Sequence, residues 1–291
     1  YSASFTPGDP KFGEQWGLSK AAFENAWSST LGSGVKIAIV DSGADVKHED
    51  LKHNIGRWRD LINDDGTVED PFKHGTHVAG IAAADTDNGI GVAGGCPNCN
   101  LLIAKVLDGS GSGTADDVAD GIIWGVKNGA KVVNLSLGDR GNARVVRDAV
   151  NYATRRGAVV VAAAGNGNTN RFEYPAAYPD VIAVAATTRD DLRASYSNYG
   201  DWVDIAAPGG EDPASYSKRI LSTIPGGKYH YMSGTSMAAP HVSALAGLLA
   251  SQGLDRASIK KLIFNTAVDL GRAGRDPYYG YGRIDAGQAV Q

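Results

Sequence analysis

A serine with the capacity for nucleophilic attack lies at Ser236, in the segment 234–241 (GTSMAAPH), directly before an apolar run with helical spacing. A serine hydroxyl becomes a good nucleophile only when a base removes its proton during attack. Serine at a helix start commonly acts only as a cap, but this string is more specific than a cap requires. We therefore predict that Ser236 is a nucleophile, favoured by the positive end of the following helix.

Two of the six histidines, His74 and His77, share the segment 74–80 (HGTHVAG) and could supply that base. A His-x-x-His pair also suggests zinc, but zinc proteases carry a glutamate directly after the first histidine, and glycine stands there in this chain. We expect one histidine to be the base and the other to be packed and hydrogen-bonded. The residue types alone do not separate the two.

Asp41 could supply the carboxylate that hydrogen-bonds to the other ring nitrogen of a histidine base. It follows the apolar run 35–40 and precedes Ser42-Gly43, so it could simply cap a turn. At the end of a buried strand, however, its charge would need a partner. The chain order of aspartate, histidine and serine is also one of the known orders of a catalytic triad. These two features favour the catalytic interpretation of Asp41.

Short apolar runs alternate with helical patterns around these residues. The apolar runs lack polar alternation, as in strands covered on both faces, and occupy 35–40, 101–106, 132–137, 159–163 and 181–185. Helical spacing occurs over 114–128, 142–156 and 237–251. The alternation predicts an α/β three-layer sandwich, with a mostly parallel central sheet between helices, as one domain over 1–291. We expect an acidic loop at 58–72 and a polar, turn-rich excursion at 209–218.

Composition excludes several classes of protein. Hydrophobic residues make up 43% and charged residues 21%, which is typical of a globular chain rather than a disordered one. The net charge of −4 provides no basic surface for nucleic acid. No apolar run approaches the roughly 20 residues that span a bilayer. The start at 1–4 lacks methionine and a signal-peptide pattern, so we expect a processed, mature form.

The only cysteines, Cys96 and Cys99, form a Cys-x-x-Cys pair. Such a pair can be a redox motif or half of a zinc site. A second ligand pair with matching spacing is missing, and the pair does not open a predicted helix. We therefore favour a local disulfide in an exported protein.

The segments 40–43, 74–80 and 234–241 together resemble the signatures of the subtilisin family (subtilases), in their order and spacing. The similarity covers nearly the whole chain and is closest to the thermitase-like branch. It implies a secreted, monomeric serine endopeptidase of broad specificity, released from an N-terminal propeptide that acts as inhibitor and chaperone. It also implies that His74 is the base, leaving His77 structural, and that Asn166 and the Ser236 N–H bind the oxyanion.

The resemblance further implies a binding site for an extended polypeptide. The residues implied to flank the substrate are Gly111, Ser112, Gly113, Ser136, Leu137 and Gly138, and those implied to wall the first specificity pocket are Ala163, Ala164 and Gly165. The pocket floor aligns with Glu173, from which we expect a preference for basic residues before the cleaved bond. The bond between Tyr174 and Pro175 is expected to be cis, as in relatives.

Calcium is the cofactor that the resemblance implies, because Ca²⁺ prefers several oxygen ligands from loops. The residues matching a tight site are Asp9, Asp50 and Asn88, with the carbonyl groups of Asp85, Ile90 and Val92. A second site would use Asp60, Asn63, Asp65, Thr67 and Glu69, although these could equally form a solvated acidic loop. A weaker or monovalent cation site would use Asp204 with carbonyl groups at Ala176, Tyr178 and Val181.

Overall fold

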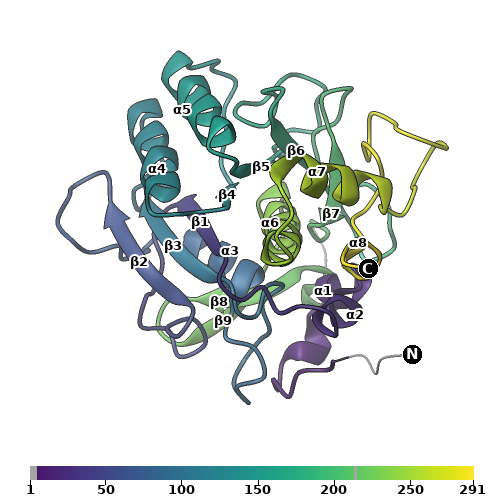
Figure 1. The fold of residues 1–291 in the computed structure, drawn as a ribbon, viewed down its shortest axis with the longest axis horizontal. Helices are drawn as coiled ribbons and strands as arrows, with labels where there is room; N and C mark the ends of the chain where they lie inside the picture. Colours follow the sequence, from purple (N-terminus) through teal and green to yellow (C-terminus); the bar gives the residue numbers. More distant parts are fainter. Residues whose placement is uncertain (1–4, 213–214) are drawn as a thin grey trace.

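A seven-stranded parallel sheet forms the centre of the molecule (Figure 1). The computed structural model describes residues 5–212 and 215–291. The strand order in space is β2-β3-β1-β4-β5-β6-β7. Their bounds are β1 Lys36–Asp41, β2 Ile55–Asp60, β3 Asn100–Lys105, β4 Val132–Leu135, β5 Val159–Ala163, β6 Val181–Thr187 and β7 Ile205–Pro208.

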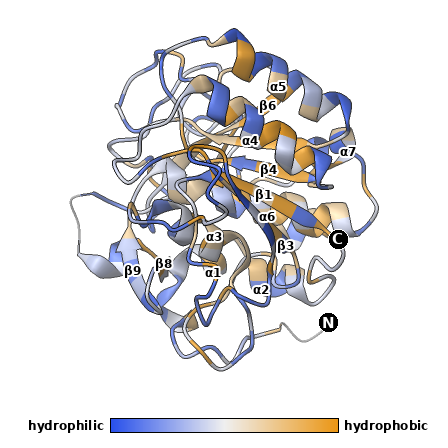
Figure 2. Ribbon diagram, turned by 90° about the vertical axis from the view of Figure 1, so that its left-hand side faces the viewer, coloured by the Kyte–Doolittle hydropathy of each residue, from blue (hydrophilic) through white to orange (hydrophobic). Residues whose placement is uncertain are grey.

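Helices cover both faces of this sheet. Helices α4 (Ala115–Lys127) and α5 (Arg144–Arg155) bury one face, and α3 (His74–Ala83) and α6 (Thr235–Ser251) bury the other. In Figure 2 the strands β1 and β4 are mostly orange, whereas α4 and α5 alternate between orange and blue. The apolar strands are therefore enclosed on both sides, which confirms the predicted α/β three-layer arrangement.

Local sequence explains where these helices begin and which surfaces they bury. Thr114 caps α4 by accepting from the Asp117 amide, and the Asp117 side chain accepts from Thr114 in return. This reciprocal pair satisfies amide groups that a helix start leaves free. Helix α6 is apolar on nearly all sides and is buried along most of its length, as expected for a helix in the core.

Smaller elements complete the chain. Strands β8 (Ile220–Ile224) and β9 (Lys228–Met232) form an antiparallel hairpin beside α3. The remaining helices are α1 (Trp16–Lys20), α2 (Phe23–Trp27), α7 (Arg256–Asn265) and α8 (Ala286–Ala289), with short 3₁₀ turns at Phe12–Glu14 and Tyr216–Lys218. None of the helices in the described ranges is both long and apolar enough to span a bilayer.

Two segments expected to be irregular can be compared with the structure. The predicted loop at 58–72 was wrong at its start, because residues 58–60 belong to the edge strand β2. In the predicted excursion at 209–218, residues 209–212 and 215–218 are described and include a 3₁₀ turn. Positions 213–214, like the start of the chain at 1–4, lie outside the described residues.

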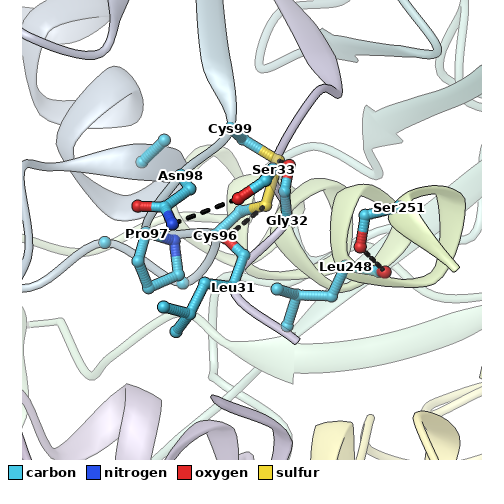
Figure 3. The surroundings of a disulfide bond; sticks show 12 residues. Leu31, Gly32, Ser33, Cys96, Pro97, Asn98, Cys99, Leu248 and Ser251 are labelled. Atoms are coloured by element: carbon cyan, nitrogen blue, oxygen red, sulfur yellow. Dashed lines mark hydrogen bonds between the residues drawn. A yellow bond between two sulfur atoms is a disulfide. The ribbon is translucent and has the colours of Figure 1, made fainter. Parts of the chain in front are cut away.

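The two cysteines form the predicted disulfide, with a 2.02 Å bond between Cys96 and Cys99 (Figure 3). Both side chains are fully buried. A Cβ on Gly32 would lie only 2.1 Å from the Cys96 sulfur, so the chain passes the disulfide at a point where only glycine fits. Because redox-active cysteines need an accessible sulfur, this enclosure favours a structural disulfide.

Candidate active site

Asp41 and His74 meet at the carboxyl end of β1. Asp41 is the last residue of this strand and is completely buried, and its Oδ1 lies 2.8 Å from His74 Nδ1. His74 is the first residue of α3. The close approach depends on Gly75, where a Cβ would lie 2.1 Å from the Gly43 carbonyl oxygen. The absence of a side chain at Gly75 therefore allows α3 to begin directly against the end of β1.

A second buried carboxylate, Asp70, holds the segments around this pair. Its Oδ1 accepts from the Ser42 hydroxyl at 2.7 Å, and its Oδ2 accepts from the Thr76 amide and hydroxyl. The Ser42 oxygen in turn accepts from the Gly75 amide at 3.0 Å. The strand end and the helix start are thus joined by hydrogen bonds, and no local pattern in the sequence predicted this role of Asp70.

The electrostatic environments of the two motif histidines differ. Burial lowers the pKa of His74, but the adjacent charge and hydrogen bond of Asp41 outweigh it, so the net pKa of His74 is raised. His77 is fully buried, and its Nε2 lies 2.9 Å from the His230 carbonyl oxygen. Burial lowers the pKa of His77 to about 3. His74 therefore has the surroundings of a base, whereas His77 has those of a packed, neutral ring.

Ser236 occupies the first turn of α6, one residue later than the start of the helix. Its hydroxyl donates to the Ser136 carbonyl oxygen at 3.1 Å, and no hydrogen bond joins it to His74 in the described part of the chain. Hydrogen bonds between catalytic groups are often long or misaligned without substrate and tighten in the complex. Ser236 as a whole residue is half-buried.

Asn166 lies beside this helix start, in the loop after β5. Its Oδ1 accepts from the amide and the hydroxyl of Thr235, each at 2.9 Å. A Cβ placed on Gly234 would lie 3.5 Å from Asn166 Nδ2 and 3.6 Å from the Ser236 nitrogen. Two N–H donors therefore border the space that glycine leaves open next to Ser236.

A cleft of about 480 Å³ extends from His74. Its lining includes the six residues predicted to flank substrate, Gly111, Ser112, Gly113, Ser136, Leu137 and Gly138. The apolar residues of the lining were not predicted as part of a cleft; they include Phe72, Leu107, Val118, Val146, Tyr174 and Tyr178. Only Phe72 carried a local signal, since it precedes His74 by two residues; the two ring centroids are 5.8 Å apart.

Glu173 and the predicted pocket walls Ala163, Ala164 and Gly165 lie outside the lining of that cleft. The Glu173 side chain nevertheless lies between two predicted substrate segments. A Cβ on Gly165 would come within 3.2 Å of Glu173 Cδ, and one on Gly138 within 3.3 Å of its Cγ. Burial raises the pKa of Glu173, although Arg140 opposes the rise. The next peptide bond, Tyr174–Pro175, is cis as predicted.

Comparisons with known proteins agree with this architecture. Residues 32–282 match the sequence profile of the subtilase (peptidase S8) family. The chain belongs to the subtilase family.

Two relatives match this subtilase over nearly its whole length. It is 47% identical to the thermophilic serine proteinase of Bacillus sp. (strain AK1), across 100% of this chain and 70% of that protein. It is 46% identical to thermitase of Thermoactinomyces vulgaris, across 99% of this chain and 100% of that protein. The predicted resemblance to the thermitase-like branch is therefore confirmed, and the chain is a serine endopeptidase of the subtilisin-like kind.

A solved protease structure from Pseudoalteromonas arctica has the same fold as this subtilase. The two share 35% sequence identity with a TM-score of 0.90, over 98% of this chain and 99% of the other. The predicted subtilisin-like sandwich is thereby confirmed.

The residues predicted to form the first calcium site of this subtilase lie close together. Asp50 Oδ1 accepts from the Asn88 side chain at 2.8 Å, and the two Asp9 oxygens accept from the amides of Asp87 and Asn88. Burial raises the pKa of Asp50 to about 7, and the charges of Asp9 and Asp85 add to the rise. Asp85 Oδ1 is buried without a hydrogen-bond partner. This concentration of buried oxygens fits a bound cation.

That fit rests on mixed oxygen ligands. No group of three or more acidic, histidine or cysteine side chains is arranged for a metal within residues 5–212 and 215–291. The predicted site, by contrast, combines two carboxylates with the Asn88 amide and the carbonyl groups of Asp85, Ile90 and Val92.

The other two predicted cation sites receive less support. Asp60 Oδ1 accepts from the Ile62 and Asn63 amides, and Asp65 accepts from Thr67, so each acid stabilises its own turn. Asp204 Oδ1 lies 3.6 Å from Arg275, which already supplies positive charge. No contact that supports a bound ion involves the other residues predicted for these two sites, within the described residues. They are Thr67 and Glu69 for the second site, and Ala176, Tyr178 and Val181 for the weaker one.

Proposed function

We propose that this subtilase hydrolyses peptide bonds through Ser236, His74 and Asp41, in one catalytic domain over residues 1–291. The Ser236 hydroxyl attacks the peptide carbonyl carbon while His74 Nε2 accepts its proton, which gives a tetrahedral intermediate. His74 then protonates the amine nitrogen as the C–N bond breaks, and the acyl-enzyme remains. Water, deprotonated by the same ring, releases the product. Asp41 holds Nδ1 and stabilises the positive charge on His74 during each transfer.

The single observation that carries this proposal is the 2.8 Å contact between buried Asp41 and His74 at a strand end. His74 lines the same cleft as Ser136, whose carbonyl oxygen accepts from the Ser236 hydroxyl. Asn166 Nδ2 and the Ser236 amide border one space, and we assign both as donors to the oxyanion. The flanking segments 111–113 and 136–138 would pair with an extended substrate main chain. Main-chain pairing tolerates many side chains, which supports broad specificity.

A fluorophosphonate probe tests the nucleophile and base together. We expect it to label Ser236, as mapped by mass spectrometry of peptides. The labelling rate should fall as the pH drops through the pKa of His74, because a protonated ring cannot accept the serine proton. Since Asp41 raises that pKa, the midpoint should lie above the ordinary histidine value of about 6.5. A folded protein that labels elsewhere, or not at all, contradicts the proposal.

We further propose that Glu173 favours arginine or lysine before the cleaved bond. A half-buried carboxylate between Gly138 and Gly165 would pair with a cationic substrate side chain. In the Glu173→Gln variant, kcat/KM for an arginine substrate should fall about tenfold or more, since a charge-assisted hydrogen bond contributes roughly 1.5–3 kcal/mol. Turnover of a matched phenylalanine substrate should change little. Equal kcat/KM for the two substrates in the unsubstituted enzyme contradicts the prediction.

Calcium is proposed to bind the site around Asp9, Asp50 and Asn88, where it would neutralise the buried carboxylates. Because only the folded chain presents these ligands together, free Ca²⁺ at about 1,000 times its Kd should stabilise the fold by about 4 kcal/mol. For a chain of this size the thermal midpoint should rise by about 10 °C over the chelated protein.

The Ser236→Ala variant allows this measurement without self-digestion. Asp50→Asn should abolish the calcium-dependent rise, whereas Asp65→Asn, an exposed acid of the second cluster, is the matched control and should retain it. An unchanged midpoint on calcium addition argues against the site.

Export, maturation by loss of an N-terminal propeptide, and a monomeric state complete the proposal. The buried Cys96–Cys99 disulfide supports export, because disulfides persist mainly in oxidising compartments.

A further inference from the structure

The main-chain carbonyl group of Ser236 cannot receive the usual hydrogen bond of a helix. In an α-helix each carbonyl oxygen accepts from the amide four residues later. For Ser236 that residue is Pro240, which lies inside α6 and has no N–H. The hydroxyl of Ser136, just beyond the end of β4, donates to this oxygen instead, at 2.8 Å. A side chain from the loop after β4 thus replaces the missing helical donor.

Ser136 is itself oriented by two buried side chains. Asn134 Nδ2 donates to the Ser136 hydroxyl oxygen at 3.0 Å, and the Ser243 hydroxyl donates to Asn134 Oδ1 at 2.8 Å. Asn134 and Ser243 are completely buried, and Ser136 is nearly so. An amide in the middle of a parallel sheet is costly unless its polar atoms are paired. Both ends of the Asn134 amide are paired here.

The order of donors and acceptors in these hydrogen bonds determines where the Ser136 hydroxyl directs its hydrogen. A hydroxyl group has one hydrogen to donate. Because Ser243 donates to the oxygen of Asn134, the nitrogen of that amide faces Ser136. Ser136 therefore accepts from Asn134, and its own hydrogen is directed to the Ser236 carbonyl oxygen. This series of hydrogen bonds starts and ends on α6, since Ser243 lies two turns after Ser236 on the same face.

We propose that Ser136, oriented by Asn134 and Ser243, is a positioning residue that replaces the hydrogen bond excluded by Pro240. It thereby holds the main chain of Ser236, and with it the attacking hydroxyl. This inference rests on the proposed role of Ser236 as nucleophile. Ser136 acts through Ser236 in this role, so its hydroxyl should affect the chemical step more than substrate binding.

Kinetics of Ser136→Ala in two backgrounds test the inference. In the otherwise unchanged enzyme, kcat should fall about tenfold, the effect of one lost hydrogen bond, while KM stays within about twofold. In a Pro240→Ala background the amide of residue 240 is restored and can bond to Ser236. There, adding Ser136→Ala should reduce kcat by less than about threefold. This dependence on the background would not arise from a general loss of packing.

Control variants separate this role from stability. Ser251→Ala removes another serine of α6 that donates to a main-chain carbonyl, that of Leu248, and should leave kcat unchanged. Ser243→Ala removes the bond that orients Asn134 and should reduce kcat about threefold. If Ser136→Ala does not fold, Ser243→Ala takes its place in both backgrounds. An unchanged kcat, or an equal loss in both backgrounds, overturns the inference. Absence of fluorophosphonate label on Ser236 in the unsubstituted enzyme would instead overturn the proposed nucleophile.

Discussion

Replacing Ser236 by alanine should lower kcat by about 10⁶-fold while leaving the fold intact. The reaction then loses its nucleophile, and the remaining oxyanion donors act only on slow attack by water. A loss of this size was measured when the serine or histidine was removed from subtilisin, a member of the same family. Peptide hydrolysis with a chromogenic substrate, together with thermal unfolding, measures both quantities.

The comparison with His74→Ala sharpens this prediction. Because His74 activates Ser236, the two residues act as one unit, so the double variant should be about as slow as either single variant. Ser251→Ala, remote from Asp41 and His74 on the same helix as Ser236, should retain full activity. Multiplicative losses in the double variant, or substantial turnover by Ser236→Ala, would show that another group performs the attack.

The strands of the sheet centre could be predicted because their environment leaves a simple pattern. Strands β1, β3, β4, β5 and β6 are covered on both faces, so each is a short apolar run. The edge strand β2 is different, since most of its residues are exposed, including Trp58. Likewise, only Ile259 and Ile263 of α7 are buried. Neither segment carries enough apolar periodicity to indicate its structure.

The three motifs of the candidate site could be predicted from the sequence, whereas the tertiary contacts around them could not. Glycine-rich segments around Asp41, His74 and Ser236 gave a local signal, because close approach of main chains restricts the residue types. The distinct roles of His74 and His77 depend on tertiary contacts. His77 bonds to the carbonyl of His230, on the partly exposed strand β9 that no pattern predicted. Only the family resemblance could separate the two rings beforehand.

The apolar lining of the cleft illustrates the same limit. Leu107, Val118 and Val146 lie far apart in sequence or in different elements, and each is an ordinary apolar residue by its local context. Their shared role arises from the packing of α4 and α5 against the sheet. The spacing of residues predicts the structure of a single helix or strand. The cleft is formed by several elements that are distant in sequence, so this spacing does not predict it.

Replacing Asn166 by alanine should lower kcat by about 10²–10³-fold with little change in KM. A donor to the oxyanion acts on charge that develops only as the peptide carbonyl is attacked, so its loss leaves ground-state binding intact. The orientation of Asn166 favours this role. Its Oδ1 is occupied by two bonds from Thr235, which directs Nδ2 toward the open space beside Gly234 and the Ser236 amide.

Two further variants examine whether the donor itself or the shape of Asn166 matters. Asn166→Asp keeps the shape but replaces the N–H donor with a negative oxygen, so it should be at least as slow as Asn166→Ala. Thr235→Val removes one bond that orients the amide and should cause a smaller loss of kcat, whereas Thr235→Ser retains the hydroxyl and should be nearly normal. Steady-state kinetics with one peptide substrate separates kcat from KM. An increase in KM with unchanged kcat would assign Asn166 to substrate binding and remove it from the oxyanion site.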